Sequence, residues 1–262
     1  MTKKSKKIHK ESGVSETIGY IILFGIMTTG IALVTLYGYP VLLNEQANAN
    51  VKNMERNMIA LQSDVKSLNF KNVPYRENTL QISGGVFKVE KFSTDTKYFK
   101  VINETGNYQL IPAASFPGNE FHPGQLLFIS EKGDILVGLQ NGAVVKREQG
   151  GSTMLSEPRW FIDSSGSDKI LVLIFTQIDS DADYAKSGIG ILQMSSEQPV
   201  EVSYLLSSAS PIRIEYHDTE SDYFSAWRNY FNTFSATTDS TVTIPSVKKV
   251  IMKFYKVKIL GL

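Results

Sequence analysis

One short run of acidic residues has a spacing that could bind a metal ion. Asp179, Asp181 and Asp183 alternate in the segment Asp-Ser-Asp-Ala-Asp. Such spacing can place carboxylate oxygens, the hard ligands that calcium prefers, around one ion. The positions that hold glycine and glutamate in an EF-hand loop are Tyr184 and Gly190 here. The run is therefore no EF-hand, and a solvated acidic loop between strands is favoured over a calcium site.

The residues that usually carry enzyme chemistry are sparse. The chain has no cysteine, which excludes a thiol nucleophile, a thiolate zinc site and a disulfide. Its three histidines, His9, His122 and His217, lie far apart in the sequence, with no spacing typical of zinc ligands or of a triad. No phosphate-binding glycine loop is present. We therefore expect no enzymatic activity, no resident metal and no cofactor.

Asn103 is a candidate for modification. Asn103-Glu104-Thr105 is the only sequon for N-glycosylation in the chain, and it lies between two strand-like runs. Glycosylation there requires that the segment lie outside the cell. Chance occurrence of such a triplet is the alternative.

The positions of charged residues near the N-terminus indicate a membrane segment. Residues 17–44 carry no charge, and about 20 apolar residues are enough for a helix to cross the hydrocarbon core. On the far side Glu45 comes first, and no basic residue precedes Lys52. By the positive-inside rule, the N-terminus lies in the cytoplasm and everything after Leu43 lies outside. The lysines that precede the segment are Lys3, Lys4, Lys6, Lys7 and Lys10.

A secretory signal peptide is the alternative interpretation of this segment. Ala47-Asn48-Ala49 has the small residues of a signal-peptidase site. The apolar core of a signal peptide, however, has about 7 to 15 residues, which is much shorter than this segment. We therefore expect the helix to be retained as a membrane anchor over residues 14–43.

Glu16 stands at the cytoplasmic end of this apolar helix. A carboxylate in lipid is costly unless it is paired or reaches the interface, so an acid in this position is a candidate functional residue. The simpler interpretation is that Ser15 caps the helix and Glu16 lies in its first turn, where the helix dipole favours an acid. The two interpretations are compatible.

The order of these features resembles a known kind of processing signal. A basic tail, Gly13, the polar stretch Val14-Ser15-Glu16-Thr17 and an immediate apolar run resemble the class III signal peptides of archaeal pilins and archaellins. The resemblance implies that a prepilin-type peptidase removes the basic cytoplasmic leader 1–13 by cutting between Gly13 and Val14. The helix then stays on the mature protein, and the new amino group of one subunit could neutralise Glu16 of a neighbour. Glu16 would be the third mature residue, whereas bacterial-type prepilins have their acid at the fifth.

Small residues recur along one face of the apolar helix. Gly25, Thr29 and Ala32 follow three- and four-residue spacing, an arrangement that lets membrane helices approach closely. We expect this face to pack against other helices, although glycine and threonine are common in membrane helices in general. Gly38 and Pro40 are expected to kink or loosen the helix near its outer end.

Residues 44–68 are expected to extend the helix as an amphipathic segment. Their apolar residues recur at alternating spacings of three and four, with polar residues between them, as on one face of a helix. We expect this stripe to pack on the chain's own following domain; an isolated coiled coil is the weaker alternative. The stripe consists of Val51, Met54, Met58, Leu61, Val65 and Leu68.

The remainder, residues 69–262, predicts a β-rich head domain. Short apolar runs alternate with glycine turns, as in an antiparallel meander or sandwich. The six apolar residues 170–175 predict a buried central strand, and residues 199–206 and 211–216 predict two further strands. Residues 222–234 predict a helix whose aromatic stripe faces the core, with an exposed adhesive surface as the alternative. Turns are expected at residues 83–85, 131–133 and 141–142.

The head also contains stretches that resemble uncharacterised archaeal pilin-like membrane proteins. They are residues 79–89, 140–144, 150–155, 157–158, 226–227 and 230–231. The resemblance supports an α+β fold, in which a long N-terminal transmembrane helix continues into an amphipathic helix packed on a mainly antiparallel β head. It implies a role in a filament or cell envelope and no defined biochemical activity.

Two functions remain open at this point. The first is a structural subunit of a pilus-like filament or related envelope assembly, whose partners are the membrane, the peptidase and other pilin-like subunits. The second is a monomeric, single-pass membrane protein that carries an extracellular binding or adhesion domain. Without residues 1–13 the chain has 22 basic and 25 acidic residues, because that leader holds five lysines and Glu11. This balance argues against a nucleic-acid partner.

Overall fold

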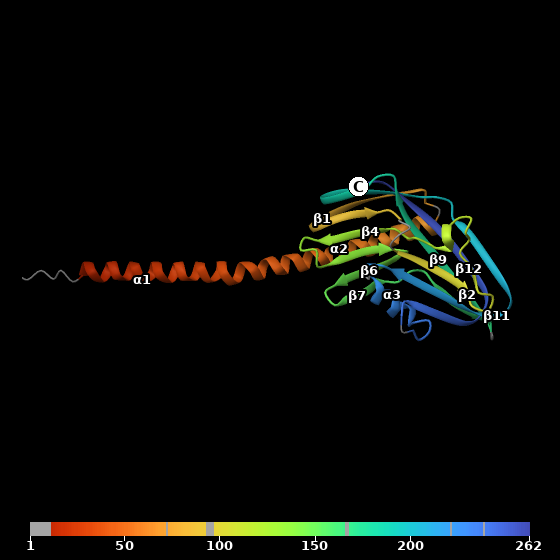
Figure 1. Ribbon diagram of the computed structural model, residues 1–262. Coiled ribbons are helices and arrows are strands. Elements are labelled where there is room, and N and C mark those ends of the chain that lie inside the picture. The colour runs from red at the N-terminus through yellow and green to blue at the C-terminus, as the bar shows by residue number, and fades with distance from the viewer. Residues whose placement is uncertain (1–11, 72, 93–96, 166–167, 221, 238) are drawn as a thin grey trace, which may run out of the picture. The chain divides into compact units, whose positions relative to one another are not determined.

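The computed structural model describes residues 12–262 except 72, 93–96, 166–167, 221 and 238. The chain forms two compact units, residues 1–49 and residues 50–262. The first contains the apolar helix, and the second, the head, contains the amphipathic helix and all the strands (Figure 1). The predicted amphipathic extension is thus mostly an integral part of the head.

The N-terminal unit is helical throughout its described part. Helix α1 spans Ser12–Leu33, a π-helical turn spans Val34–Gly38, and helix α2 begins at Tyr39 and ends at Phe70. The π-turn ends at Gly38, two residues before Pro40. Because proline lacks an N–H and crowds the preceding turn, the predicted loosening of the helix is confirmed. Because α1 already begins at Ser12, Ser15 is not the N-cap, and this part of the sequence interpretation is wrong.

The head is built on one twelve-stranded sheet in the order β3-β2-β11-β12-β10-β1-β4-β5-β6-β7, to which β9 adds beside β12 and β8 beside β9. All pairs are antiparallel except β9 with β12, which is parallel. The predicted α+β class is therefore confirmed. The strands are β1 (Tyr75–Glu90), β2 (Lys97–Asn103), β3 (Tyr108–Gln109), β4 (Gln125–Ser130), β5 (Leu136–Gln140), β6 (Ala143–Glu148), β7 (Gly151–Ser156), β8 (Phe161–Ser165), β9 (Asp168–Ser180), β10 (Tyr184–Ser196), β11 (Val200–Asp218) and β12 (Thr241–Gly261).

One core of the head lies between α2 and the sheet. The predicted apolar stripe of α2 is fully buried: Met58 is 0% exposed and Leu61 is 1% exposed. These side chains pack with residues of β1, β4, β5 and β10. The packing of the stripe on the chain's own head is thus confirmed.

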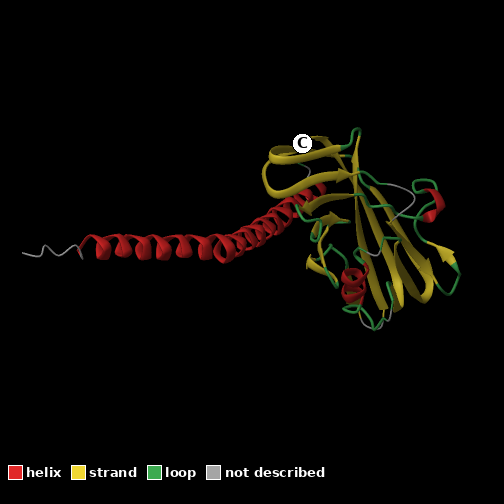
Figure 2. Cartoon of the chain, turned by 60° about the vertical axis from the view of Figure 1, so that its left-hand side comes forward, coloured by secondary structure: helices red, strands yellow, loops and turns green. Residues whose placement is uncertain are grey.

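A second, aromatic core lies on the opposite side of some of the same strands. In β6, Ala143 and Val145 belong to this core, whereas Val144 between them belongs to the α2 core. Alternate residues of a strand point to opposite faces, so this strand separates the two cores. Figure 2 shows α3 (Phe224–Phe231) beside the sheet, and its Trp227 and Phe231 are 0% exposed within the aromatic core. The aromatic stripe is therefore core, and the alternative of an exposed adhesive surface is wrong.

Two predicted turns have the expected form. Asn141 and Gly142 join β5 to β6, with φ values of 48° and 71°, and two such residues in a row make the tight turn that matches the twist of a hairpin. Residues 131–133 similarly connect β4 to β5. Residues 170–175 lie within β9, between β8 and β12, as predicted for a central strand.

Two other predictions of element boundaries are wrong. Residues 83–85 form no turn: β1 continues through them, with a shift of register between Ile82 and Phe87. The two strands predicted over residues 199–206 and 211–216 form one strand, β11, which begins at Val200 and is irregular between Leu205 and Ile212. In both cases glycine or proline marks an irregularity inside a long strand instead of its end.

Candidate functional site

The residues of the predicted processing site lie at the start of α1. Gly13 and Val14 belong to the helix, whereas His9 and the leader lysines lie outside the described residues. Glu16 is exposed in α1. One helix in the described part of the chain, Glu16–Phe70, is long and apolar enough to cross a membrane, which is consistent with a single-pass anchor.

The surface of α1 has no covering from the described chain. Its large apolar side chains are between 51% and 69% exposed. A side-chain carbon added at Gly25 would meet no atom within 4 Å. The Thr29 hydroxyl donates to the Gly25 carbonyl at 2.7 Å, and the Thr35 hydroxyl donates to the Ile31 carbonyl at 2.9 Å. These hydroxyls satisfy their hydrogen bonds within the helix, so the face of Gly25, Thr29 and Ala32 can meet lipid or another helix without an unpaired polar group.

The acidic run lies where β9 connects to β10. Asp179 is 2.9 Å from the Lys256 ammonium, and Asp181 is 2.9 Å from the Lys258 ammonium. In the described ranges, no group of three histidine or acidic side chains is arranged to hold a metal ion. The structure therefore assigns Asp179 and Asp181 to ion pairs with β12 and gives the calcium hypothesis for Asp179, Asp181 and Asp183 no support.

The side chain of Asn103, the asparagine of the sequon, is buried and forms hydrogen bonds within the head. Asn103 is 4% exposed, and its side-chain nitrogen donates to the Tyr108 hydroxyl at 2.9 Å. Its side-chain oxygen accepts from the Thr105 N–H at 3.1 Å. A glycan is attached through that same nitrogen, so modification of the folded head would require this turn to open. The structure therefore argues against the glycosylation candidate.

Two histidines that are distant in sequence both lie beside one tyrosine, Tyr98. The Tyr98 ring is 4.5 Å from the His217 ring, on which it stacks, and 5.6 Å from the His122 ring. His217 lies 3.2 Å from Glu215, and His122 lies 3.5 Å from a carboxylate oxygen of Glu120. The arrangement is a chain of aromatic and ionic contacts between β2, β11 and the segment that connects β3 to β4. It brings together no nucleophile and base.

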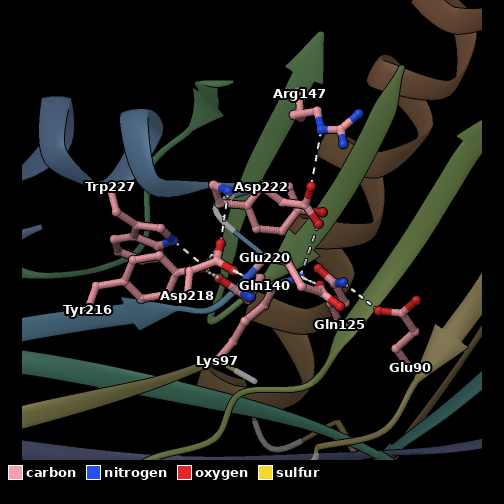
Figure 3. A network of polar contacts seen from close by, with 11 residues as sticks. Glu90, Lys97, Gln125, Gln140, Arg147, Tyr216, Asp218, Glu220, Asp222 and Trp227 are labelled. Atoms are coloured by element: carbon pink, nitrogen blue, oxygen red, sulfur yellow. Dashed lines mark hydrogen bonds and ion pairs between the residues drawn. The ribbon is translucent and has the colours of Figure 1, made fainter. Parts of the chain in front are cut away.

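A polar network in the head was not predicted (Figure 3). The Lys97 ammonium lies 2.9 Å from Glu220 and 3.5 Å from Asp222, and Arg147 lies 3.1 Å from Asp222. Lys97 belongs to β2, Arg147 to β6, and the two acids to the segment before α3. The network therefore ties the start of α3 to two separate strands.

Burial and charge act together in this network. Burial on its own would lower the pKa of Lys97, but the hydrogen bond to Glu220 and the surrounding carboxylates outweigh it and raise that pKa. Burial, with the charge of Asp218, raises the pKa of Tyr216 well above its ordinary value. Burial, with the charge of Asp222, does the same for Tyr223. All three groups thus keep their protons at neutral pH.

The network continues into the aromatic core. The Trp227 indole N–H donates to Gln140 Oε1 at 3.2 Å, and the Tyr216 hydroxyl lies 3.2 Å from the same oxygen. The Tyr223 hydroxyl is buried without a hydrogen-bond partner, and a side-chain carbon at Gly138 would overlap it. In the sequence, the alternating acids Asp218, Glu220 and Asp222 are the signal that could have indicated this network. Their lysine and arginine partners come from strands far away along the chain.

Comparison with protein families identifies the chain. The model of a family described as a family of unknown function, DUF7289, matches residues 13–259. The chain belongs to the DUF7289 family. Neither a comparison with curated proteins nor one with solved structures gave a match. The match to DUF7289 covers both α1 and the head, so the two units together are characteristic of the family.

Proposed function

We propose that this DUF7289 chain is a pilin-like structural subunit of an archaeal type IV pilus-like filament or a related cell-envelope assembly. In this proposal α1 sits in the cell membrane, the N-terminus lies in the cytoplasm and the head lies outside. The observation that carries it is the surface of α1, whose large apolar side chains are at least half exposed all round the helix. A helix of this kind needs lipid or other helices around it.

The N-terminal sequence supports a subunit that is processed before assembly. The lysine-rich leader, Gly13 and the apolar helix follow one another as in class III signal peptides. The match to the family begins at residue 13, at the proposed cleavage site. A prepilin-type peptidase would thus release a mature chain that begins at Val14 and keeps the whole helix.

Glu16 is the residue that would couple processing to assembly. Cleavage before Val14 creates an amino group close to Glu16 in the sequence. In lipid, an isolated carboxylate is costly, and pairing with a neighbour's amino group removes that cost. Glu16 is exposed on α1, so its side chain is available to a second subunit.

The competing function is a monomeric membrane anchor for a binding domain. The two functions differ in whether the leader is removed and whether α1 associates with other helices.

The test combines the native N-terminus with the yield of filaments. N-terminal sequencing of the protein purified from membranes should give Val14, and Glu16→Gln should leave membrane levels unchanged but lower recovery in sheared surface filaments. Glu45→Gln is the matched control, because Glu45 is also an exposed helical acid. An intact Met1 or Thr2 on most molecules rejects processing, and a start at Asn50 indicates ordinary secretion. Absence of the wild-type protein from sheared material favours the monomeric anchor.

A further inference from the structure

The part of α2 that belongs to the head starts beside an irregular stretch of β1. Asn50, the first residue of the head unit, lies against Gly84: a side-chain carbon added at Gly84 would be 2.7 Å from the Asn50 side-chain nitrogen. Gly84 has a φ of 67° and lies where the register of β1 shifts, between Ile82 and Phe87. The Gly84 carbonyl accepts from the Glu131 N–H at 2.8 Å, which brings the β4–β5 loop to the same place. This end of the head is therefore built around the start of its helix.

A groove of about 610 Å³ opens at this end of the head. Its lining comes from the irregular part of β1, from the loop 131–133 and from Ser187 of β10. Two apolar side chains are exposed there: Val86 in the lining is 36% exposed, and Ile189, two residues beyond Ser187, is 69% exposed. Exposed apolar groups that lie together mark surfaces that contact proteins or membranes. We call this surface the entry rim, which consists of residues 84–88, 131–133 and 186–189.

The entry rim also carries lysines. Lys88, Lys132 and Lys186 belong to it, together with one acid, Glu131, and Asp134 follows directly in the same loop. Three lysines against two acids leave one positive charge in excess. Lysine side chains near a membrane surface are attracted to acidic headgroups. The apolar side chains are thus the main feature that suits the rim to a membrane interface, and the lysines add to it.

The length of the chain limits how far the entry rim can lie from lipid. The uncharged segment ends at Asn44, and the head unit begins at Asn50. The six residues between these positions reach at most about 20 Å, even when fully extended. If the uncharged segment spans the membrane, as the proposed function requires, Asn50 lies within that distance of the membrane's outer surface. The rim, which is built around Asn50, can therefore reach the lipid headgroups.

We propose that the entry rim docks on the outer surface of the membrane. Val86 and Ile189 enter the headgroup region, where they lose contact with water, and the lysines of the rim pair with lipid phosphates. The proposal rests on the proposed anchoring of α1 in the membrane but not on filament assembly. Docking shields the apolar side chains of the rim from water before the head meets another subunit.

The test uses the full chain in nanodiscs that hold one copy each. Because the chain has no cysteine, Ser187→Cys in the rim and Ser208→Cys in β11 each give one site for the fluorophore bimane. Both serines are exposed. Ser208 lies where β11 pairs with the first half of β12, whereas β10 pairs with the last residues of that strand. With nitroxide-labelled lipid headgroups, bimane at position 187 should be quenched far more strongly than bimane at position 208.

Variants of the apolar residues separate docking from mere proximity to the membrane. Val86→Ser combined with Ile189→Ser should lower the ratio of docked to undocked heads about tenfold or more, as read from quenching at position 187, because two apolar contacts are lost. Leu205→Ser is the matched control: Leu205 is 75% exposed and lies outside the rim, so the quenching should not change.

The lysines are tested in discs of acidic lipid. Lys186→Gln should lower the ratio of docked to undocked heads about fivefold there, and less in discs of zwitterionic lipid. Lys71→Gln, which alters an exposed lysine that follows the end of α2, is the control and should have no effect in either lipid.

The outcomes distinguish docking from anchoring and from self-association. Equal quenching at positions 187 and 208, or quenching that the double serine variant leaves unchanged, overturns the proposal. A chain that does not co-elute with the discs contradicts both the docking and the proposed function, whereas co-elution without quenching contradicts the docking alone. Excimers of pyrene at position 187 in two-copy discs, without quenching in single-copy discs, would overturn the proposal in favour of a second copy as the partner. Melting curves verify that the head of each variant is folded.

Discussion

Gly25 of α1 and Gly138 of the head stand in opposite surroundings. At Gly19, Gly25 and Gly30 an added side-chain carbon would meet no atom of the described chain within 4 Å, whereas at Gly138 it would overlap the Tyr223 hydroxyl. The head therefore requires its glycine for its own packing. Packing within the described chain does not require glycine at these three positions of α1. Any packing reason for these glycines therefore lies in the lipid or helices around α1.

Apolar residues show the same contrast within one helical region. Phe24 of α1 is 69% exposed, whereas Met58 of α2 is completely buried. The first helix is apolar on all sides and the second only along one stripe, as expected for surroundings of lipid or helices and for one packed face, respectively. Substitutions in the two regions should therefore differ in whether they affect the stability of the head.

The largest effect is expected from charges in the buried stripe. Met58→Asp combined with Leu61→Asp should destabilise the head by at least about 5 kcal/mol, because two large apolar side chains are lost and two carboxylates are buried. This is comparable to the whole stability of many domains, so the head should be unfolded at room temperature. Thermal melting followed by circular dichroism measures the change.

The matched control alters exposed charges on the same helix. Lys52 and Arg56 are exposed in α2, so Lys52→Ala combined with Arg56→Ala should change stability by less than about 1 kcal/mol. If the aspartate pair melts like the wild type, α2 does not hold the head together, and the contrast between the two helices fails.

The second prediction concerns the packing of Gly138. Gly138→Ala should cost about 1 to 3 kcal/mol, because the new carbon overlaps the Tyr223 hydroxyl. Tyr223→Phe should be neutral or stabilising on its own, since that hydroxyl has no hydrogen-bond partner, and it should recover much of the loss in the double variant. Urea unfolding of all four proteins measures the coupling. Additive effects of the two substitutions would contradict the close contact.

The third prediction is a loss of head stability in alkali. The pKa values of Lys97, Tyr216 and Tyr223 are raised in the folded head, so these groups keep protons that the unfolded chain releases above about pH 10. Their contribution to stability is complete below that pH and falls as pH rises further. Melting temperatures from pH 8 to pH 11 should therefore decline at the upper end. The decline should be smaller in Tyr223→Phe; an identical pH profile would exclude Tyr223 as a contributor.

The smallest effect on the head is expected from α1. Gly25→Ile should leave its melting temperature unchanged, because the added side chain meets no atom of the described chain. The same substitution should lower self-association of the full protein in detergent, measured by crosslinking, if this face packs against another α1. Met27→Ala is the control, because the helical spacing places Met27 on the side of α1 opposite to Gly25, Thr29 and Ala32. A fall in head stability on Gly25→Ile would show that the two units depend on one another.

Features that depend on residues close together in the sequence, such as helical periodicity and tight turns, were predictable. The stripe from Val51 to Leu68 was found because helical periodicity reports which face is buried. The Asn141-Gly142 turn was found because both residues tolerate positive φ. The turn predicted at residues 83–85 and the strand start predicted at Pro211 were wrong, because glycine and proline occur in turns and also in irregular long strands.

The polar contacts of the head could not be predicted in this way. Asp222 pairs with Lys97 and Arg147, which lie on two strands far away in the sequence. The sequence does not show which strands become neighbours, and the parallel pairing of β9 with β12 in particular had no local signal.

The position of β12 has a consequence for how the head is made. This strand pairs with β9, β10 and β11, all of which precede it in the chain. During synthesis, the edges of these three long strands that pair with β12 have no partner until residues 241–261 have left the ribosome. Sheets closed by such distant pairings form slowly, and their waiting edges are prone to pair with the wrong partner. The head should therefore depend on a chaperone far more than α1, whose backbone bonds form as soon as each turn is made.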